Sequence, residues 1–202
     1  MLTVYHLNES RSVRVLWLLE EIDVPYEIVR FQRDHTRRAP AELMKIHPLG
    51  KSPVIRDGDL LLAESGAIVE YLVERHGGGR LAPRPDTAAW GRYLQWLHFA
   101  EGSAMLPLLL ELFLGMGLIP GGKDGLLFGF VKAELGRQLD YVEQELGDRE
   151  HLLGAFTAAD VMMGFPLDLA ERQGHLAGRE RLLAYLARLR ARPAYQRAQA
   201  AA

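Results

Sequence analysis

The first part of the chain alternates short apolar segments of strand type with longer segments of helix type. Residues 13–23 carry two apolar stripes at helical spacing, and a helix that is apolar on two faces is usually covered by other layers on both. The segment Asp57-Gly58-Asp59 separates two apolar runs and is typical of a hairpin turn. The pattern predicts the order β-α-β-α-β-β-α, with strands at Leu2–Leu7, Tyr26–Phe31, Ser52–Ile55 and Leu60–Leu62 and helices at Val13–Asp23, Pro40–Ile46 and Glu64–His76.

A segment rich in glycine and proline, Gly77–Pro85, interrupts this alternation. The later segments have helical periodicity, apart from a glycine-rich loop at Gly115–Gly125. We expect helices at Thr87–Leu114, Leu126–Leu146, Ala158–Gln173 and Arg181–Arg190, with a short one from Pro193. The pattern therefore predicts a first domain over residues 1–77, a linker over residues 78–86 and an all-helical domain over residues 87–202.

Thr157 and Asp160 have the spacing of a capping box ahead of an apolar run. The threonine hydroxyl can accept from the backbone N–H three residues later, and the aspartate can accept from the backbone N–H of the threonine. We expect this pair to begin a buried helix, so that Asp160 has a structural rather than a catalytic role.

The composition excludes several classes of function. The chain has 202 residues, no cysteine and a formal net charge of −2. A chain without cysteine forms no disulfide, thiolate metal site or cysteine nucleophile, and a near-neutral charge gives no support to nucleic-acid binding. Its seven histidines lack the spacing of a metal motif, and no apolar run approaches the ~20 residues of a membrane span. We expect a cytoplasmic protein with no metal, no membrane partner and no nucleic-acid partner.

Two local motifs have more than one interpretation. Gly50-Lys51-Ser52 looks like the end of a phosphate-binding loop, but Lys45 stands where that loop needs glycine, and Pro53 opposes a helix start. Ser52–Pro53 is either an ordinary trans bond at a strand start or a cis bond, and its place between a β-α-β segment and a hairpin favours cis. A basic cluster of three arginines is interpreted as a solvated loop rather than an anion site: Arg33, Arg37 and Arg38.

Four blocks, taken together in this order, resemble the cytosolic glutathione transferase family. They are YHLNESRSVRVLWLLEE at residues 5–21, HPLGKSPV at residues 47–54, LAESGAI at residues 62–68 and FTAAD at residues 156–160. The first block is most similar to bacterial and fungal members that have a serine at the active site. The resemblance covers nearly the whole chain. It implies an α/β thioredoxin-like N-terminal domain with a mixed four-stranded sheet, followed by an all-helical (all-α) C-terminal domain.

The resemblance also implies a role for individual residues. Ser10 matches the catalytic hydroxyl of serine-type members, although Tyr5 stands where tyrosine-type members keep their phenol, and the two compete. We favour Ser10, because it falls at the start of the first helix. The glutathione-binding positions and their implied partners are Lys51 for the glycyl carboxylate, Ser52 with Pro53 for the cysteinyl backbone, and Glu64 with Ser65 for the γ-glutamyl group.

The implied function is conjugation of glutathione, as co-substrate, to a hydrophobic electrophile. The electrophile site is expected between the domains, with Phe99, Met105 and Leu106 as candidate residues, although core packing is the commoner role for any one of them. Two alternatives stay open: a non-catalytic glutathione- or ligand-binding scaffold, and a glutathione-dependent peroxidase or isomerase. The resemblance further implies a two-fold homodimer.

Overall fold

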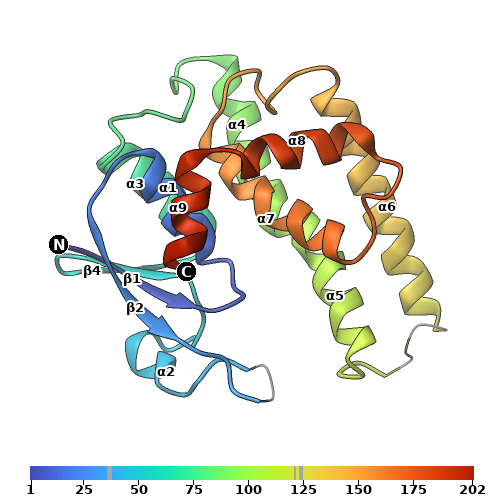
Figure 1. Ribbon diagram of the computed structural model, residues 1–202, viewed down its shortest axis with the longest axis horizontal. Coiled ribbons are helices and arrows are strands. Elements are labelled where there is room, and N and C mark those ends of the chain that lie inside the picture. The colour runs from blue at the N-terminus through green and yellow to red at the C-terminus, as the bar shows by residue number, and fades with distance from the viewer. Residues whose placement is uncertain (36–37, 121, 123–124) are drawn as a thin grey trace. The chain divides into compact units, whose positions relative to one another are not determined.

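The computed structural model describes residues 1–35, 38–120, 122 and 125–202 (Figure 1). One arginine of the predicted basic cluster, Arg37, lies outside these residues, as do Gly121, Lys123 and Asp124 of the predicted glycine-rich loop. By their contacts the described residues form two compact units. The first joins Met1–Arg84 with Leu189–Ala202, and the second is Pro85–Arg188.

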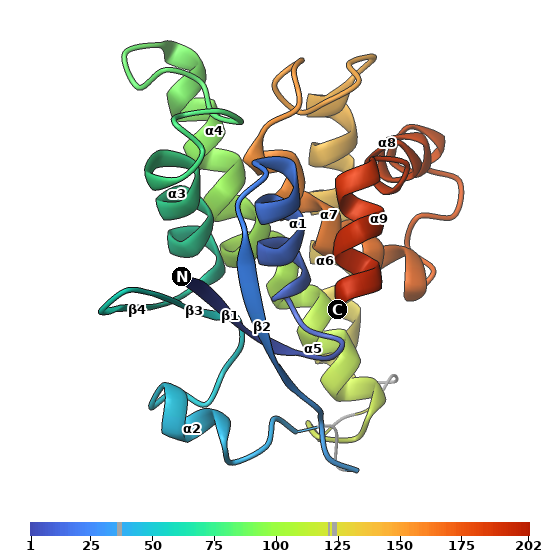
Figure 2. The ribbon, with the colours of Figure 1, turned by 60° about the vertical axis from the view of Figure 1, so that its left-hand side comes forward.

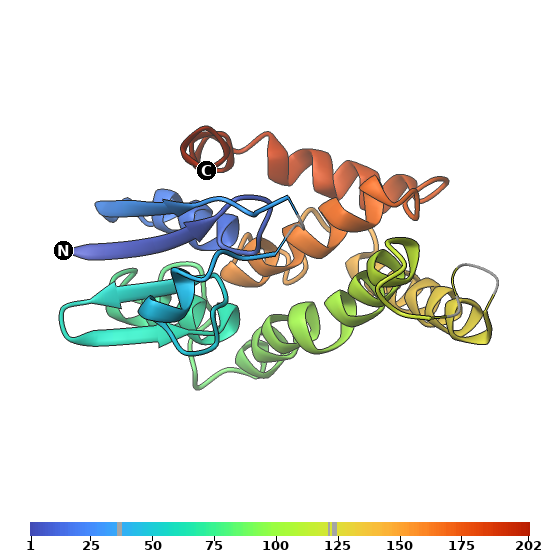
Figure 3. The same ribbon diagram turned by 90° about the horizontal axis from the view of Figure 1, so that it is seen from below.

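The first unit is built on a mixed four-stranded sheet with the strand order β2-β1-β3-β4. Strand β1 (Leu2–Leu7) runs parallel to β2 (Tyr26–Phe31) and antiparallel to β3 (Val54–Asp57), which pairs in turn with β4 (Leu60–Ala63). Figure 3 shows the parallel pair beside the β3–β4 hairpin. The predicted thioredoxin-like sheet is therefore confirmed, with β3 beginning at Val54 rather than at Ser52.

Helices cover both faces of this sheet. Side chains alternate between the faces of β1, so that Val4 and His6 point one way and Tyr5 and Leu7 the other. Tyr5 and Leu7 form a buried cluster with Leu43 of the short helix α2 (Leu43–Ile46). On the other side lie α1 (Val13–Glu21) and α3 (Ser65–Arg75), which contact each other. Figure 2 shows α1 and α3 above the strands and α2 below them.

The last helix, α9 (Pro193–Ala201), packs against α1 within the first unit. The Trp17 and Tyr195 rings meet edge to face with centroids 5.0 Å apart. Arg192 donates to both carboxylate oxygens of Glu21, at 2.6 and 2.8 Å. This contact explains why α1 is apolar on two faces, since α3 and the sheet cover one and α9 the other. The contact also places α9 in the first compact unit, whereas the sequence analysis assigned all of residues 87–202 to the helical domain.

The second unit is helical. One continuous helix, Ala88–Gly115, comprises α4 (Ala88–Phe99), a π-helical turn η1 (Ala100–Ala104) and α5 (Met105–Gly115). The remaining helices are α6 (Leu126–Leu146), α7 (Ala158–Arg172) and α8 (Glu180–Arg190), the last of which ends in the first unit. The 28-residue helix is long and apolar enough to cross a bilayer by length and composition, a test that core helices of water-soluble proteins also pass.

The predicted capping box begins α7 and is confirmed. One Asp160 oxygen accepts from the backbone N–H of Thr157 at 2.8 Å and from its hydroxyl at 3.1 Å. The other accepts from the Leu152 N–H at 3.0 Å and from the Tyr185 hydroxyl at 2.7 Å. Burial and the nearby Asp160 carboxylate raise the pKa of Tyr185 well above its usual value, so the phenol stays protonated as a donor. Asp160 is therefore a structural centre that joins the loop before α7 to α8.

Candidate functional site

The predicted glutathione-binding segments meet at one end of the sheet. Tyr5 pairs with Val54, and Val54 pairs with Ala63. The end of β1, the start of β3 and the end of β4 therefore share one edge region. The loop that leads to Ser10 follows β1, Ser52–Pro53 precedes β3, and Glu64–Ser65 follows β4. Strand topology alone thus brings three separate sequence blocks together within the first unit.

Two helices begin at this end of the sheet. Helix α1 starts three residues after Ser10, and α3 starts at Ser65. The first backbone N–H groups of a helix have no partner within it, and the aligned peptide dipoles add a partial positive charge there. At the start of α1 the carbonyls of residues 10–12 already accept from these N–H groups, so the dipole is what remains for a ligand. This end of the unit is consequently suited to a ligand with anionic groups.

Ser10 lies in a tight turn just before α1 and is 7% exposed. Its carbonyl accepts from the Val13 N–H at 3.4 Å, and its hydroxyl oxygen accepts from the Ser12 N–H at 3.2 Å. The Ser10 and Ser12 hydroxyl oxygens are 2.7 Å apart. The side chain is therefore held by its own turn, close to the start of the helix.

An arginine two residues after the end of β2, Arg33, holds the same loop by hydrogen bonds. The backbone N–H of Arg33 donates to the Asn8 side chain at 2.7 Å, and its Nε donates to the Asn8 carbonyl at 3.2 Å. A further guanidinium nitrogen reaches the Glu9 carbonyl at 3.3 Å. The loop needs such a brace, because Glu9 adopts the left-handed region at a φ of 49°. Arg33 therefore has a positioning role that the sequence analysis missed.

Tyr5 occupies a different environment from Ser10. Its ring belongs to the buried cluster on the α2 side of the sheet, and its hydroxyl accepts from Arg56 Nε at 3.2 Å. Strand alternation points this side chain away from the face that α1 covers. The hydrogen bonds of the described residues thus give the Tyr5 hydroxyl a partner on β3 and the Ser10 hydroxyl a partner at the start of α1.

The Ser52–Pro53 bond is cis, as predicted. The Ser52 hydroxyl donates to the Tyr5 carbonyl at 2.9 Å and so ties this segment to β1. Ser52 lies just before the paired residues of β3. An extended ligand backbone can add to a sheet at such a position, by pairing with backbone groups that no neighbouring strand covers.

Glu64 and Ser65 join β4 to α3 in an unusual conformation. Glu64 has a φ of 73° and a ψ of 119°, a combination that costs a non-glycine residue on the order of 1–3 kcal/mol. Such outliers are concentrated at functional sites. Glu64 and Lys51 are exposed, and neither has an ion-pair partner among the residues that the structure describes, whereas Ser65 is 4% exposed. One free carboxylate and one free ammonium are thus available to a ligand.

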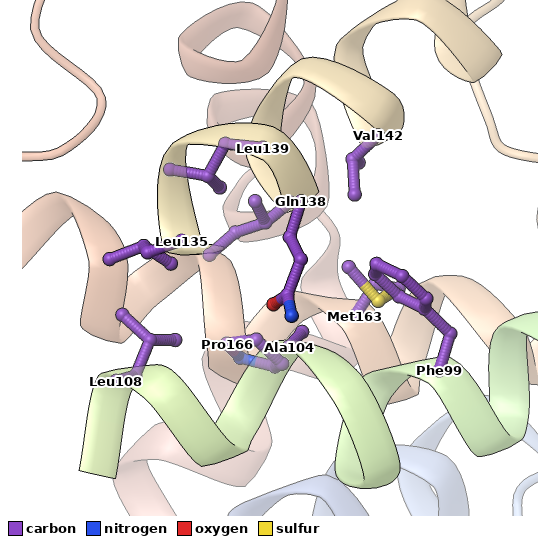
Figure 4. Close-up of a pocket in the computed structure, with 10 residues that line it drawn as sticks. Phe99, Ala104, Leu108, Leu135, Gln138, Leu139, Val142, Met163 and Pro166 are labelled. Atoms are coloured by element: carbon purple, nitrogen blue, oxygen red, sulfur yellow. The ribbon is translucent and has the colours of Figure 1, made fainter. Parts of the chain in front are cut away.

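The three candidate electrophile residues do not share one environment. Phe99 packs on Trp96 and Tyr141, with centroids 5.3 and 5.6 Å away, and lines a small pocket of the second unit (Figure 4). Met105 is 2% exposed and Leu106 is 56% exposed. Neighbouring helical residues point about 100° apart, so apolar character alone could not group them on one surface.

His6 and Ser12 lie next to Ser10, although the sequence analysis considered the histidines only as metal ligands and found no metal motif among them. Ser12 Oγ lies 2.9 Å from His6 Nδ1 and 2.7 Å from Ser10 Oγ. Strand alternation along β1 could have indicated this position from the sequence, because it places His6 on the face of the sheet that α1 covers. Within the described ranges, no group of three or more histidine, cysteine, aspartate or glutamate side chains could hold a metal ion.

Comparison with known proteins agrees with this architecture. Residues 1–74 match the family described as the N-terminal domain of glutathione S-transferase. Glutathione S-transferase 3 of Schizosaccharomyces pombe is 36% identical over 184 residues, which cover 85% of this chain and 75% of that protein. Glutathione S-transferase 1 of Saccharomyces cerevisiae is 34% identical over 189 residues, which cover 84% of this chain and 81% of the relative.

Two solved structures are similar over almost all of the chain. A glutathione S-transferase from Actinobacillus pleuropneumoniae has a TM-score of 0.89 at 32% identity, covering 100% of this chain and 92% of that one. A family member from Pseudomonas fluorescens, solved with two glutathione molecules bound, has a TM-score of 0.84 at 29% identity, covering 98% and 91%. From its fold, its site and these relatives, this chain belongs to the glutathione S-transferase family.

Proposed function

We propose that this protein binds glutathione at the end of the sheet and conjugates it to an electrophilic small molecule. The observation that carries the proposal is the meeting of Ser10, Ser52–Pro53 and Glu64–Ser65 where α1 and α3 begin. The bound glutathione in the Pseudomonas fluorescens relative supports the choice of ligand. We propose no metal in the reaction.

Each charged group of glutathione has a complementary partner in this arrangement. The free carboxylate of Glu64 suits the γ-glutamyl ammonium, and the N-terminus of α3 at Ser65 suits the neighbouring carboxylate. The free ammonium of Lys51 suits the glycyl carboxylate. The backbone of Ser52 suits strand-like pairing with the cysteinyl residue. The ligand would then lie across the loops, with its sulfur towards Ser10.

The site must stabilise the thiolate form of glutathione, because the thiolate is the nucleophile. A free cysteine thiol has a pKa of about 8.5, and lowering that pKa by about two units requires about 2.7 kcal/mol of selective stabilisation of the anion. A hydrogen bond from the Ser10 hydroxyl to the sulfur and the partial positive charge at the start of α1 both act in this direction. The thiol proton passes to solvent when the thiolate forms. With an activated aryl halide, the thiolate then forms a carbon–sulfur bond, the carbon–halogen bond breaks, and the halide ion leaves with the bonding electron pair.

We assign thiol activation to Ser10 rather than Tyr5, as in serine-type members of the family. Two observations support the assignment: Ser10 lies where α1 begins, and the Tyr5 hydroxyl is engaged by Arg56 in the cluster on the α2 side.

Two assays test the function and its alternatives. The protein should be retained on immobilised glutathione and should turn over an activated aryl halide only in the presence of glutathione. Retention without turnover of an aryl halide or an organic hydroperoxide would favour the ligand-binding scaffold. Turnover of the hydroperoxide alone would favour a peroxidase, and failure to be retained would contradict the proposed site.

We also propose a two-fold homodimer, the commonest closed assembly of soluble proteins. Sedimentation at micromolar concentration should then give about twice the chain mass of 22.7 kDa. A species that sediments as a single chain at that concentration would contradict this part of the proposal.

A further inference from the structure

His6 is buried beneath the turn that holds Ser10, and only one of its ring nitrogens has a polar partner. The residue is 3% exposed. Its Nδ1 lies 2.9 Å from Ser12 Oγ. Its Nε2 is buried and has no hydrogen-bond partner among the described residues. The two nitrogens of a neutral imidazole differ, since one carries a proton and the other a lone pair.

The hydrogen bonds of Ser12 leave two arrangements for this network. A hydroxyl has one proton and two lone pairs. One lone pair of Ser12 Oγ accepts from the Leu7 N–H at 3.3 Å. Ser12 Oγ also lies 3.4 Å from the Leu7 carbonyl oxygen, its longest contact. A proton directed there would leave only one lone pair for two short contacts, to Ser10 Oγ at 2.7 Å and to His6 Nδ1 at 2.9 Å, so we assign the proton and the remaining lone pair to these two. Ser12 therefore either accepts from His6 and donates to Ser10, or accepts from Ser10 and donates to His6.

The two arrangements give Ser10 opposite properties. When Ser12 donates to it, the Ser10 oxygen also accepts from the Ser12 N–H, so both of its lone pairs are used and its proton is free. When Ser10 donates to Ser12, its proton is used and a lone pair is left over. Only the first arrangement lets Ser10 donate a hydrogen bond to a thiolate, because a lone pair facing a thiolate is repulsive.

The buried Nε2 favours the first arrangement. If Nδ1 carries the proton, Nε2 has a lone pair that no donor reaches. If Nδ1 is unprotonated, Nε2 carries the proton and is a buried N–H without an acceptor. Among buried backbone groups, an N–H without an acceptor is rarer than an under-satisfied carbonyl oxygen, and we apply the same order to the ring nitrogens. Burial and the positive charge of Arg30, the β2 partner of His6 in the ladder, lower the pKa of His6, so the ring is neutral and a single tautomer has to be chosen.

We propose that His6 is a positioning residue whose Nδ1–H, acting through the Ser12 hydroxyl, turns the Ser10 hydroxyl towards the sulfur of glutathione. The inference deepens the proposed function and rests on it. His6 touches neither the ligand nor the reacting atoms in this role. It acts by setting the direction of two hydroxyl groups between itself and the sulfur.

The tautomer of His6 can be measured in the wild-type protein without any assay of activity. Long-range ¹⁵N–¹H correlation spectra of protein labelled with ¹⁵N-histidine distinguish a protonated Nδ1 from a protonated Nε2. The His6 signals are assigned by their loss in His6→Asn. We expect the Nδ1–H tautomer at neutral pH, and an Nε2–H tautomer would overturn the proposal.

A matched pair of variants tests the consequence for the sulfur. The asparagine and leucine side chains of His6→Asn and His6→Leu have similar size and branching, but only asparagine places an N–H donor near the position of Nδ1. We expect His6→Leu to raise the thiol pKa of bound glutathione and to lower kcat at about pH 6.5 by roughly threefold to tenfold. His6→Asn should stay close to wild type, and glutathione affinity should change little in both.

A double-mutant cycle separates positioning from packing. Added to Ser10→Ala, the His6→Leu change should cause no further rise of the thiol pKa, because the hydroxyl that it orients is absent. Equal damage by Asn and Leu, or an additional rise in the Ser10→Ala background, would overturn the role of His6. A wild-type protein that binds glutathione without ionising it would overturn the proposed thiolate mechanism itself, and the role of His6 with it.

Discussion

Asp160→Ala is expected to lower the free energy of unfolding by about 3–5 kcal/mol, because it leaves several buried donors without an acceptor. The carboxylate is fully buried and accepts from the N–H groups of Leu152 and Thr157 and from the hydroxyls of Thr157 and Tyr185. Each unsatisfied buried donor costs on the order of 1–3 kcal/mol, and partial rearrangement reduces the total. Urea unfolding of the wild type and the variant measures this difference.

Two further variants serve as controls for Asp160→Ala. Thr157→Ala removes the N-cap hydroxyl and a methyl group but keeps the Asp160 carboxylate, and it should cost about 1 kcal/mol. Asp140→Ala, which removes an aspartate of α6 that is 70% exposed and paired with Arg179, should cost less than about 1 kcal/mol. If Asp160→Ala were no more destabilising than Asp140→Ala, the carboxylate would not be the structural centre described above.

Ser10→Ala is expected to cut turnover at about pH 6.5 by roughly tenfold or more, which corresponds to about 1.4 kcal/mol of lost thiolate stabilisation. The variant keeps the start of α1, Lys51, Ser52 and Glu64, so the affinity for glutathione should change little. The thiol pKa of bound glutathione should rise towards its value in water. Ultraviolet absorbance of the thiolate, followed against pH, measures that shift independently of turnover.

Tyr5→Phe is the matched control for the loss of a hydroxyl. Its phenol bonds to Arg56 on the opposite side of the sheet from α1, so the thiol titration should be nearly that of wild type. If Tyr5→Phe shifted the titration and Ser10→Ala did not, the assignment would be reversed and the enzyme would be of the tyrosine type.

Asp160 and Ser10 both place a side-chain oxygen near the start of a helix, but with different effects. Asp160 accepts from donors that would otherwise be buried without partners, so its effect is on stability. In the proposed arrangement, Ser12 donates to Ser10, whose lone pairs are then used within its own turn while its proton is left for a ligand. In the opposite arrangement the Ser10 proton is used within the turn and is not available to a ligand.

Much of the fold was predictable from local sequence patterns. The four strands, the hairpin turn, the helices and the capping box follow from short-range periodicity and capping chemistry, which act over a few neighbouring residues. Local patterns were not enough to predict the cis Ser52–Pro53 bond or the glutathione-binding roles of Lys51, Glu64 and Ser65. These predictions required the order of elements or the resemblance to a family, since a proline or a lysine has several local interpretations.

The sequence by itself determined the elements, the absence of cysteine chemistry and the capping of α7, because neighbouring residues decide these features. Only the tertiary structure decided that α9 packs on α1, that Phe99, Met105 and Leu106 have separate environments, and that His6 lies beneath Ser12 and Ser10. These are contacts between side chains that helix rotation, strand register and burial bring together or hold apart. Residue type and spacing along the chain do not specify such contacts, because their energy exists only once the elements are packed.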